Sequence, residues 1–472
     1  MVLCPRIIEM ILFFLLVVNT NASVVYVSTT NGDDSFDGKT QEKPLRSIKK
    51  ALLCSDTILL KCGDVFYEDI SLYNHFLSYY DEGVKPRISG YKRIKSAHWE
   101  REQDNIWKIR LAGNGFSGFL QHSSSLFNNV GGLHEYDIDS IHGRKLQFKN
   151  QLKEDWDFWQ TNHYKHENTS ATDFDFLYLY LSQDPNLLNI EFSVGAIGVT
   201  MRHSTIDGIR IEGFGRHGIL GWSGSVIRNC DIDGIGGMTQ IGYEKFVSLG
   251  NGIEFYISED ISNCLVERCR ISRCYDCGIT IQGAKYGQAT PTSIIVKNNL
   301  ITNCCQGWED FLRNDDNIVY HNCSFLDNII LNSGKTSGFN YPSRFKYCHI
   351  LGNNFKGDKG MIIRNNTFVG GNYYCSGAYN GQYKSNTWID NICYIKRGDY
   401  ILSNYLGTKD VIRIPKEKGK FKSLKLATDD AIARYREMTG DKTTKFIIKS
   451  DDYLKRKIES EKRKYENRIS KL

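Results

Sequence analysis

The chain has 472 residues, enough for one large elongated domain or for two to three ordinary ones. It contains only 7 prolines but 42 glycines, 27 tyrosines and 24 phenylalanines, and this composition favours a turn-rich β protein over a helical one. The net charge of +6 is compatible with an acidic partner without demanding one, and we expect no nucleic-acid partner.

Residues 1–22 have the pattern of a secretory signal peptide. Arg6 gives a positive start, residues 11–18 form an unbroken apolar run, and small residues precede the expected cleavage site after Ala22. A membrane anchor is the alternative, but the run is shorter than the ~20 residues that span a bilayer. We therefore expect a secreted or periplasmic protein, monomeric, with no integral membrane segment after signal removal.

The first elements of the mature chain look like a cap. A strand is predicted at 24–27, a Gly- and Asp-rich loop at 31–43, and a second strand at 57–60. Between them, residues 45–53 form a short predicted helix, with apolar residues at helical spacing: Leu45, Ile48, Ala51 and Leu52. Such an opening would seal the end of a stacked β core.

Residues 91–193 lack the sequence repeat that is found later in the chain. They contain four of the seven tryptophans, Trp99, Trp107, Trp156 and Trp159, and one clear strand at 176–181. We interpret the segment as an irregular β insertion within a main domain at 23–405. A separate domain is the alternative.

From about residue 199 to 395, one short sequence motif, called a phrase below, recurs. It consists of an apolar pair, a polar residue that is usually Asn, a small polar residue, one more, and then Ile or Phe. Its copies lie 24 to 43 residues apart, centred on Asn229, Arg268, Asn298, Asn322 and Asn365. A near-constant phrase at uneven spacing is typical of stacked units with variable loops. The copies predict a parallel β-helix whose strands lie ~4.8 Å apart, with the Asn side chains stacked as a ladder.

Cysteines follow the same repeat. The mature chain would have 13 of the 14, an odd number that cannot all pair internally. Most occupy repeat positions, which favours small apolar side chains stacked in a core: Cys230, Cys264, Cys269, Cys274, Cys304 and Cys323. A zinc or redox role for Cys274 and Cys277 is the weaker alternative, because no second CxxC accompanies them.

Residues 406–472 are predicted to be a helical, basic extension. A helix at 428–438 would be capped by Thr428 or Asp429 and stopped by Gly440. A second, amphipathic helix at 451–472 places four apolar residues on one face: Leu454, Ile458, Tyr465 and Ile469.

The chain resembles the pectate-lyase-like right-handed parallel β-helix proteins of secreted carbohydrate enzymes. The resemblance lies in Val-Tyr-Val-Ser at 25–28, Asp-Gly-Lys-Thr at 37–40, Pro-Leu-Arg-Ser-Ile at 44–48, Gly-Asp-Val-Phe at 63–66, Ile-Asp-Gly-Ile at 206–209 and the Asn-bearing coils. It implies an all-β, right-handed parallel β-helix. It implies polysaccharide lyases first, then glycoside hydrolases, epimerases and binding proteins. No run matches a metal-binding or catalytic motif of one lyase family, and fold alone does not fix the reaction.

A second phrase, centred on glycine, recurs one strand further along each coil. Its copies contain Gly218, Gly252, Gly278, Gly307 and Gly338, and the apolar residue after each should point inward. The intervening residues should form an outward strip: His217, Trp222, Glu254, Tyr256, Thr280, Gln282, Glu309 and Asn340, with Arg344 just beyond. Aromatic, amide, imidazole and carboxylate groups together suit a sugar-binding groove. The alternative is a strip of cross-strand pairs that keeps the sheet soluble.

The reaction that we favour from the sequence is β-elimination from an anionic polysaccharide containing uronic acid. His217 or Tyr256 would be the base, and Arg344, Arg313, Asn251 or Gln282 would hold the substrate carboxylate. Trp222, Asn340 and Tyr341 would bind the saccharide. Calcium is a predicted cofactor, held by oxygen ligands from Glu254, Asp276 and Glu309.

Two alternatives remain open. Glu254 and Glu309 would lie two coils apart, roughly 9–10 Å, which is near the ~6.5–9.5 Å of inverting glycoside hydrolases and far from the retaining distance. Thr280 occupies the slot between them. The third possibility is a glycan-binding protein that does not cleave.

Overall fold

The computed structural model describes residues 24–94, 98–111, 130–160, 176–238, 249–283, 290–312, 320–334, 348–352, 360–371, 373–377, 386–404 and 411–471. The predicted signal peptide at 1–22 lies outside these ranges. So do four of the predicted site residues: Arg313, Asn340, Tyr341 and Arg344. Among the helices in the described ranges, none is both long and apolar enough to cross a membrane.

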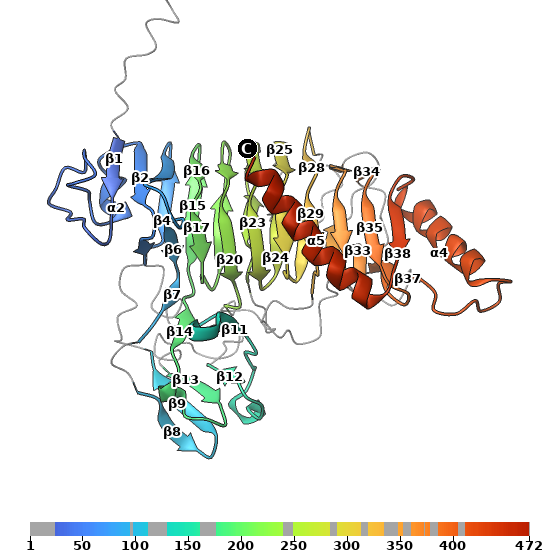
Figure 1. Cartoon of the computed structure of the whole chain (residues 1–472), viewed down its shortest axis with the longest axis horizontal. Coiled ribbons are helices and arrows are strands. Elements are labelled where there is room, and N and C mark those ends of the chain that lie inside the picture. The colour runs from blue at the N-terminus through green and yellow to red at the C-terminus, as the bar shows by residue number, and fades with distance from the viewer. Residues whose placement is uncertain are drawn as a thin grey trace, which may run out of the picture.

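Three ten-stranded sheets, A, B and C, run the length of the molecule (Figure 1). Sheet A contains β1 (Val24–Val27), β2 (Thr57–Lys61), β5 (Phe76–Tyr80), β16 (Thr205–Asp207), β19 (Val226–Arg228), β22 (Ile261–Glu267), β25 (Pro291–Lys297), β28 (Ser324–Leu326), β31 (Ile362–Arg364) and β34 (Thr387–Ile389). Sheet B contains β3 (Val65–Phe66), β6 (Arg87–Ser89), β17 (Arg210–Glu212), β20 (Asp231–Ile235), β23 (Arg270–Cys274), β26 (Leu300–Thr302), β29 (Ile329–Leu331), β32 (Thr367–Val369), β35 (Ile392–Ile395) and β38 (Lys445–Ile448). Sheet C contains β4 (Ile70–Tyr73), β15 (Ile197–Arg202), β18 (His217–Gly221), β21 (Ile253–Ile257), β24 (Cys277–Gly283), β27 (Gln306–Leu312), β30 (Cys348–Gly352), β33 (Tyr373–Gly377), β36 (Tyr400–Asn404) and β37 (Ile412–Arg413).

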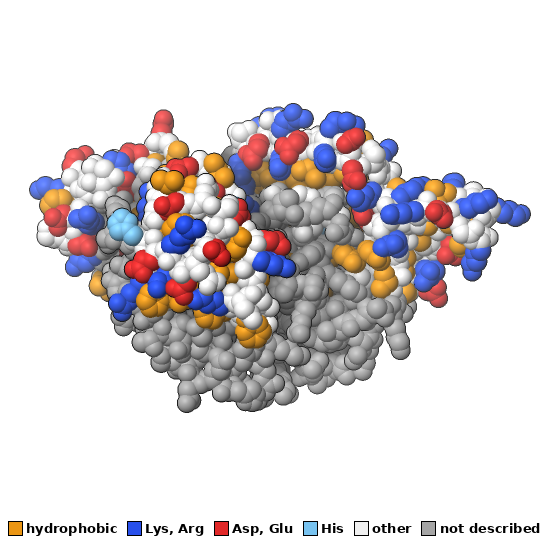
Figure 2. All heavy atoms as spheres, turned by 90° about the horizontal axis from the view of Figure 1, so that it is seen from below, with side chains coloured by type: hydrophobic (Ala, Val, Ile, Leu, Met, Phe, Trp, Pro, Cys, Tyr) orange, Lys and Arg blue, Asp and Glu red, His pale blue; other side chains and the backbone are white. Residues whose placement is uncertain are grey.

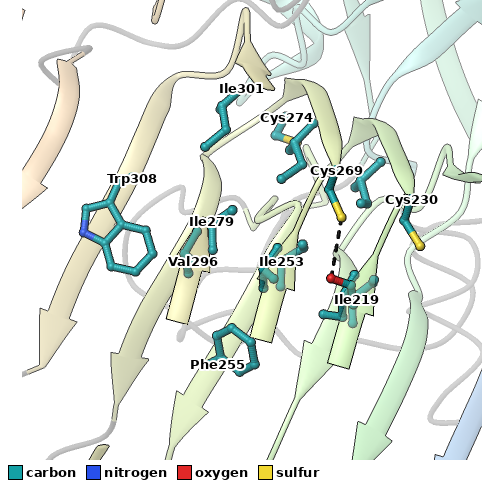
Figure 3. Close-up of a cluster of buried hydrophobic side chains, with 14 of the residues drawn as sticks. Ile219, Cys230, Ile253, Phe255, Cys269, Cys274, Ile279, Val296, Ile301 and Trp308 are labelled. Atoms are coloured by element: carbon teal, nitrogen blue, oxygen red, sulfur yellow. Dashed lines mark hydrogen bonds between the residues drawn. The ribbon is translucent and has the colours of Figure 1, made fainter. Parts of the chain in front are cut away.

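The predicted parallel β-helix is confirmed. Except at the two ends of the stack, where β37 for instance pairs antiparallel with β36, each coil contributes one strand to each sheet. Equivalent residues stack in register: Ile227 pairs with Val266, and Val266 with Val296. The inward side chains form one continuous core. As predicted, the residues that follow the phrase glycines point inward, and Ile219, Ile253, Ile279 and Trp308 stand in a row in Figure 3.

The corner between sheets A and B explains the Asn-rich phrase. Only Asn298 and Asn299 separate β25 from β26. Asn298 has a φ of 57°, in the left-handed region that Asn tolerates better than most residues. The next residue turns inward, so the ladder lies one residue later than predicted: the backbone N–H of Asn299 donates to Oδ1 of Asn328 at 2.9 Å, and that of Asn328 to Oδ1 of Asn366 at 2.9 Å.

Asn322 does not belong to this ladder. It precedes β28, whereas the matching corner of that coil is Asp327 and Asn328, between β28 and β29. Asn322 also has a positive φ, 52°. Because both corners require the same backbone conformation, both attract Asn, and the sequence repeat was assigned one corner too early at this copy.

The phrase glycines are required by the approach of neighbouring coils. A Cβ on Gly218 would lie 2.5 Å from the carbonyl oxygen of Gly252, and one on Gly252 would lie 2.6 Å from that of Gly278. These distances leave no room for a side chain, so the glycines fix the backbone of sheet C next to the predicted site.

The cysteines lie in the core, as the repeat predicted. All thirteen from Cys54 to Cys393 are thiols, and those at the repeat positions are buried. The Sγ of Cys269 donates to the carbonyl oxygen of Ile227 at 3.7 Å, the contact drawn in Figure 3. With no disulfide among them, packing and hydrogen bonds hold these coils together.

Helices lie at both ends of the coil stack (Figure 1). At the N-terminal end, α2 (Ile48–Ala51) buries Ile48 and Ala51, and it is shorter than the predicted 45–53. At the other end, α4 (Leu424–Thr439) begins four residues before the predicted 428, because Ser423 caps it by accepting a hydrogen bond from Leu426. Gly440 stops it, as predicted, with a φ of 74°. Basic side chains gather around α4 in Figure 2.

The insertion forms two small sheets with a core of their own. One contains β7 (Tyr91–Lys92), β10 (Leu133–Glu135), β11 (Ser140–His142) and β14 (Ile190–Ser193); the other contains β8 (Glu100–Gln103), β9 (Ile106–Arg110), β12 (Phe158–Trp159) and β13 (Phe176–Tyr180). Short 3-10 turns lie at Tyr136–Ile138, Lys149–Gln151 and Pro185–Leu187. Arg273 of sheet B reaches Asp139 at 3.0 Å, and Ile141 packs against Tyr275, so the insertion contacts the coils beside the site.

The last helix folds back over the coils. Helix α5 (Asp451–Ile469) lies across sheet B in Figure 1. Its predicted apolar face packs there: Leu454 and Tyr465 are buried in a cluster with Leu331 and Val369. Near its C-terminal end, the Tyr465 hydroxyl donates to the carbonyl oxygen of Cys269 at 3.0 Å.

Candidate functional site

The candidate site begins with a column of side chains on the outward face of sheet C. The register places Glu254 beside Thr280, and Thr280 beside Glu309. The two glutamates therefore lie two strands apart with Thr280 between them, the arrangement expected from the sequence. Tyr256 and Gln282 form the next column and are half-buried.

Glu254 is held by the start of its own strand. The side-chain amide of Asn251 donates to its Oε2 at 2.9 Å, and Nδ1 of His217 lies 3.1 Å from the same oxygen. Asn251 is itself fixed, because its Oδ1 accepts from the backbone N–H of Cys277 at 3.1 Å and its own N–H donates to His217 Nδ1 at 3.2 Å. Neighbouring coils thus orient one carboxylate rigidly.

The surroundings of Glu309 differ from those of Glu254. The Thr280 hydroxyl donates to its Oε2 at 2.9 Å. Burial, followed by the charge of Asp276, raises the pKa of Glu309 well above its ordinary value, and Glu254 adds to the effect. The surroundings of Glu309 therefore favour its protonated form.

Asp276 lies at the corner that precedes β24, and its carboxyl group interacts electrostatically with both glutamates. Its backbone N–H donates to Gly250 at 3.0 Å, and its carbonyl oxygen accepts from Gln306 at 2.9 Å. Burial and the nearby charge of Glu254 raise the pKa of Asp276 to about 7. Burial also lowers the pKa of His217, and the charge of Arg216 contributes, so the imidazole is neutral at pH 7.

These side chains are more enclosed than the open groove that we expected. The exposed fraction is 4% for His217, 3% for Glu254 and 6% for Glu309, and Thr280 is fully buried. They nevertheless belong to the outward column, not to the core of the coil. An enclosed carboxyl cluster strengthens charge interactions, because the local dielectric is low.

The predicted saccharide-binding Trp222 and two tryptophans of the insertion have other contacts. Trp222 follows the end of β18 at the corner toward sheet A, where Arg202 lies 6.0 Å from its ring centroid. Trp156 and Trp159 belong to the insertion: Trp156 stacks on His142, and Trp159 donates to the carbonyl oxygen of Gln147.

The structure adds two polar residues that sequence reasoning missed. Arg216 directly precedes His217, and its Nε is shielded from solvent without a hydrogen-bond partner in the described ranges. Gln306 starts β27 at the position that pairs with Cys277; it is 1% exposed, and its Oε1 lacks a hydrogen-bond donor. The only sequence signal for both was their position at or just before the start of a glycine-centred phrase.

The predicted calcium ligands do not form a complete metal site. Within the described ranges, no group of three or more His, Cys, Asp or Glu side chains is placed to hold a metal ion. Glu254 Oε2 already accepts from Asn251, and Glu309 Oε2 from Thr280. Calcium binding stays a prediction, and the reaction proposed below assigns it no step.

The three parallel sheets define a parallel β-helix protein of the pectate-lyase-like architecture. No known protein-family profile matches the chain, and no curated protein sequence matches it. Solved structures with a similar architecture include a complex of XylC with xylose (14% identity, TM-score 0.40, 81% of this chain and 69% of that chain). They also include the GH136 lacto-N-biosidase from Eubacterium ramulus (13%, 0.37, 95% and 71%) and the periplasmic alginate epimerase AlgG (9%, 0.29, 84% and 78%).

Proposed function

We propose that this protein is a carbohydrate-active enzyme that hydrolyses a glycosidic bond with inversion, using Glu309 as the general acid and Glu254 as the general base. One observation carries the proposal: two outward carboxyl groups lie two strands apart in register, and burial raises the pKa of one of them, Glu309. Pairs of carboxyl groups whose surroundings favour different protonation states are typical of acid–base catalysis.

The roles follow from the surroundings of each group. Glu309 donates its proton to the oxygen of the leaving sugar. Glu254, held by Asn251, accepts a proton from a water that attacks the opposite face of the sugar ring. Strands two apart are roughly 9–10 Å from each other, near the upper end of the ~6.5–9.5 Å that separates the carboxyl groups of inverting enzymes. Burial is the main cause of the raised pKa of Glu309, and Asp276 raises it further when that residue is ionised.

The test uses Glu309→Gln and Glu254→Gln. Each should lower the rate of cleavage by at least about a hundredfold, because each removes one proton-transfer group. The measurement is the release of new reducing ends from a panel of neutral and acidic polysaccharides, with the anomeric configuration of the first product read by NMR. Glu259→Gln is the matched control, since Glu259 is an ion-pairing surface glutamate that follows β21.

Cleavage at the wild-type rate in both site variants would exclude the pair. A product with retained configuration would exclude the assigned roles. Binding without cleavage across the whole panel would support the glycan-binding alternative instead.

A second candidate is β-elimination from a uronic acid polymer, and one observation favours it. The Arg216 guanidinium lies next to His217, and its Nε has no partner in the part of the chain that the structure describes. In this reaction the neutral His217 would remove the proton beside the substrate carboxylate, while Arg216 would neutralise that carboxylate. Elimination leaves an unsaturated sugar that absorbs ultraviolet light. That absorbance, appearing with the new chain ends, would favour elimination over hydrolysis.

A further inference from the structure

A pocket with a volume of about 220 Å³, which shares no residue with the carboxyl cluster, lies between the end of α5 and the corner that joins sheets A and B. Its walls include Asp327, Asn365, Thr367, Lys464, Tyr465 and Arg468. The volume is roughly that of seven waters in the liquid, so the pocket has room for more than a simple ion.

Arg468 is the unusual member of this wall. Its Nε and Nη2 atoms are both shielded from solvent, and neither has a hydrogen-bond partner among the residues that the structure describes. Its guanidinium carbon lies 5.5 Å from the centroid of the Tyr465 ring, a contact with the π face that uses none of the N–H donors. Arg468 lines the pocket and its charge is not balanced by a carboxylate in the described ranges, so that charge would stabilise an anion held in the pocket.

The neighbouring charges are already paired. Lys464 donates to Glu461 at 2.9 Å, and Lys457 lies 2.7 Å from the same carboxylate. Arg270, on the other side of Tyr465, pairs with Glu466. Of the cations that line the pocket within the described ranges, Arg468 is therefore the one whose charge lacks an ion pair.

The remaining wall is suited to hydroxyl groups. Asn365 projects from a corner with a φ of 58° and is exposed, while Thr367 starts the next strand. Asp327 stands at the equivalent corner of the preceding coil, also with a positive φ. Carboxylate, amide and hydroxyl side chains recognise the hydroxyls of a sugar ring, whereas a planar guanidinium recognises a carboxylate through two parallel hydrogen bonds.

We propose that this pocket binds an acidic sugar, with the sugar carboxylate on Arg468 and its hydroxyls on Asp327, Asn365 and Thr367. The site is separate from the carboxyl cluster and does not depend on the reaction proposed there. It would hold one end of an acidic glycan on the face of the molecule that α5 covers.

Calorimetric titration of the full chain carrying Glu309→Gln tests the proposal, with galacturonate as the probe and galactose, acetate and sulfate as comparisons. Galacturonate should bind more tightly than any of the three. Arg468→Gln should weaken its binding by at least about tenfold, as expected when a charge-assisted, two-point contact is lost. Arg463→Gln, which changes an exposed arginine of the same helix, should leave binding unchanged.

Two results would overturn the proposal. One is galacturonate binding that is absent, or no tighter than galactose binding, in the parent chain. The other is acetate or sulfate binding as tightly as galacturonate, which would make the pocket a simple anion site. Thermal unfolding of Arg468→Gln without ligand shows whether that variant is folded. Cleavage of polysaccharide is assayed separately, so failure of either proposal leaves the other standing.

Discussion

At the level of single residues, the carboxyl cluster couples proton binding to folding. Burial and Glu254 raise the pKa of Asp276 from 3.8 to about 7. Between about pH 4 and about pH 7, the unfolded chain releases this proton while the folded chain keeps it. The free energy of unfolding should therefore fall as pH rises through this window and should not recover above it. The pKa of Glu309 is displaced in the same direction.

Denaturant unfolding of wild type and Asp276→Asn, at about pH 4.5 and about pH 8, checks this sign. The wild type should lose more stability than the variant between the two conditions, because Asn cannot ionise. Parallel losses in the two proteins would show that Asp276 titrates normally.

Sequence reasoning placed the strand residues of the site correctly but gave less guidance on the corner residues. The alternation along β21, β24 and β27 predicted that Glu254, Thr280 and Glu309 share one face, and the register places them side by side. Asp276 precedes β24 and Arg216 precedes β18, at corners where no periodicity relates sequence position to direction. The sequence suggested Asp276 as a calcium ligand, whereas in the structure it shapes the charge state of Glu309.

At the level of elements, the inward Asn ladder should support several coils at once. Asn328 is fully buried: its Oδ1 accepts from the backbone and side-chain N–H groups of Asn299, and its Nδ2 donates to Val296 and Asn366. Asn328→Ala leaves those donors unpaired, and we expect it to lower the free energy of unfolding by at least about 2 kcal/mol.

The matched control is Asn298→Gly. It changes the left-handed position of a similar corner without touching the ladder, and glycine adopts that conformation readily. A change below about 1 kcal/mol is expected in denaturant unfolding. If the two variants proved equally destabilised, the corner conformation and not the ladder would carry the stability.

At the level of the whole molecule, α5 clamps the coils together. Tyr465 is fully buried between the helix and sheet B. Tyr465→Ala should cost about 3–5 kcal/mol, since it empties a large buried volume, whereas Tyr465→Phe removes only the hydrogen bond to Cys269 and should cost about 1 kcal/mol. Thermal unfolding of both variants measures the clamp, and a small loss for Tyr465→Ala would mean that the helix is dispensable.

The path of α5 was beyond prediction from the sequence. Its apolar face, with Leu454 and Tyr465, was evident from spacing alone, and so was the stacked architecture. The receiving surface is made by Leu300, Leu331 and Val369, whose side chains lie on the outer side of sheet B. No pattern in the helix identifies which of the three sheets it covers, because each sheet has apolar residues.

Arg270 binds Glu466, which lies 196 residues later in the chain, so the ribosome makes the two partners at different times. At roughly 5–20 residues per second, a ribosome needs about 10–40 s to advance from the first partner to the second. During that interval the coils can form while the outer surface of sheet B, which α5 will later cover, is still exposed to solvent. The nascent chain therefore exposes an apolar stripe until α5 emerges from the ribosome. A chaperone would be required at this stage of synthesis more than for the folded protein.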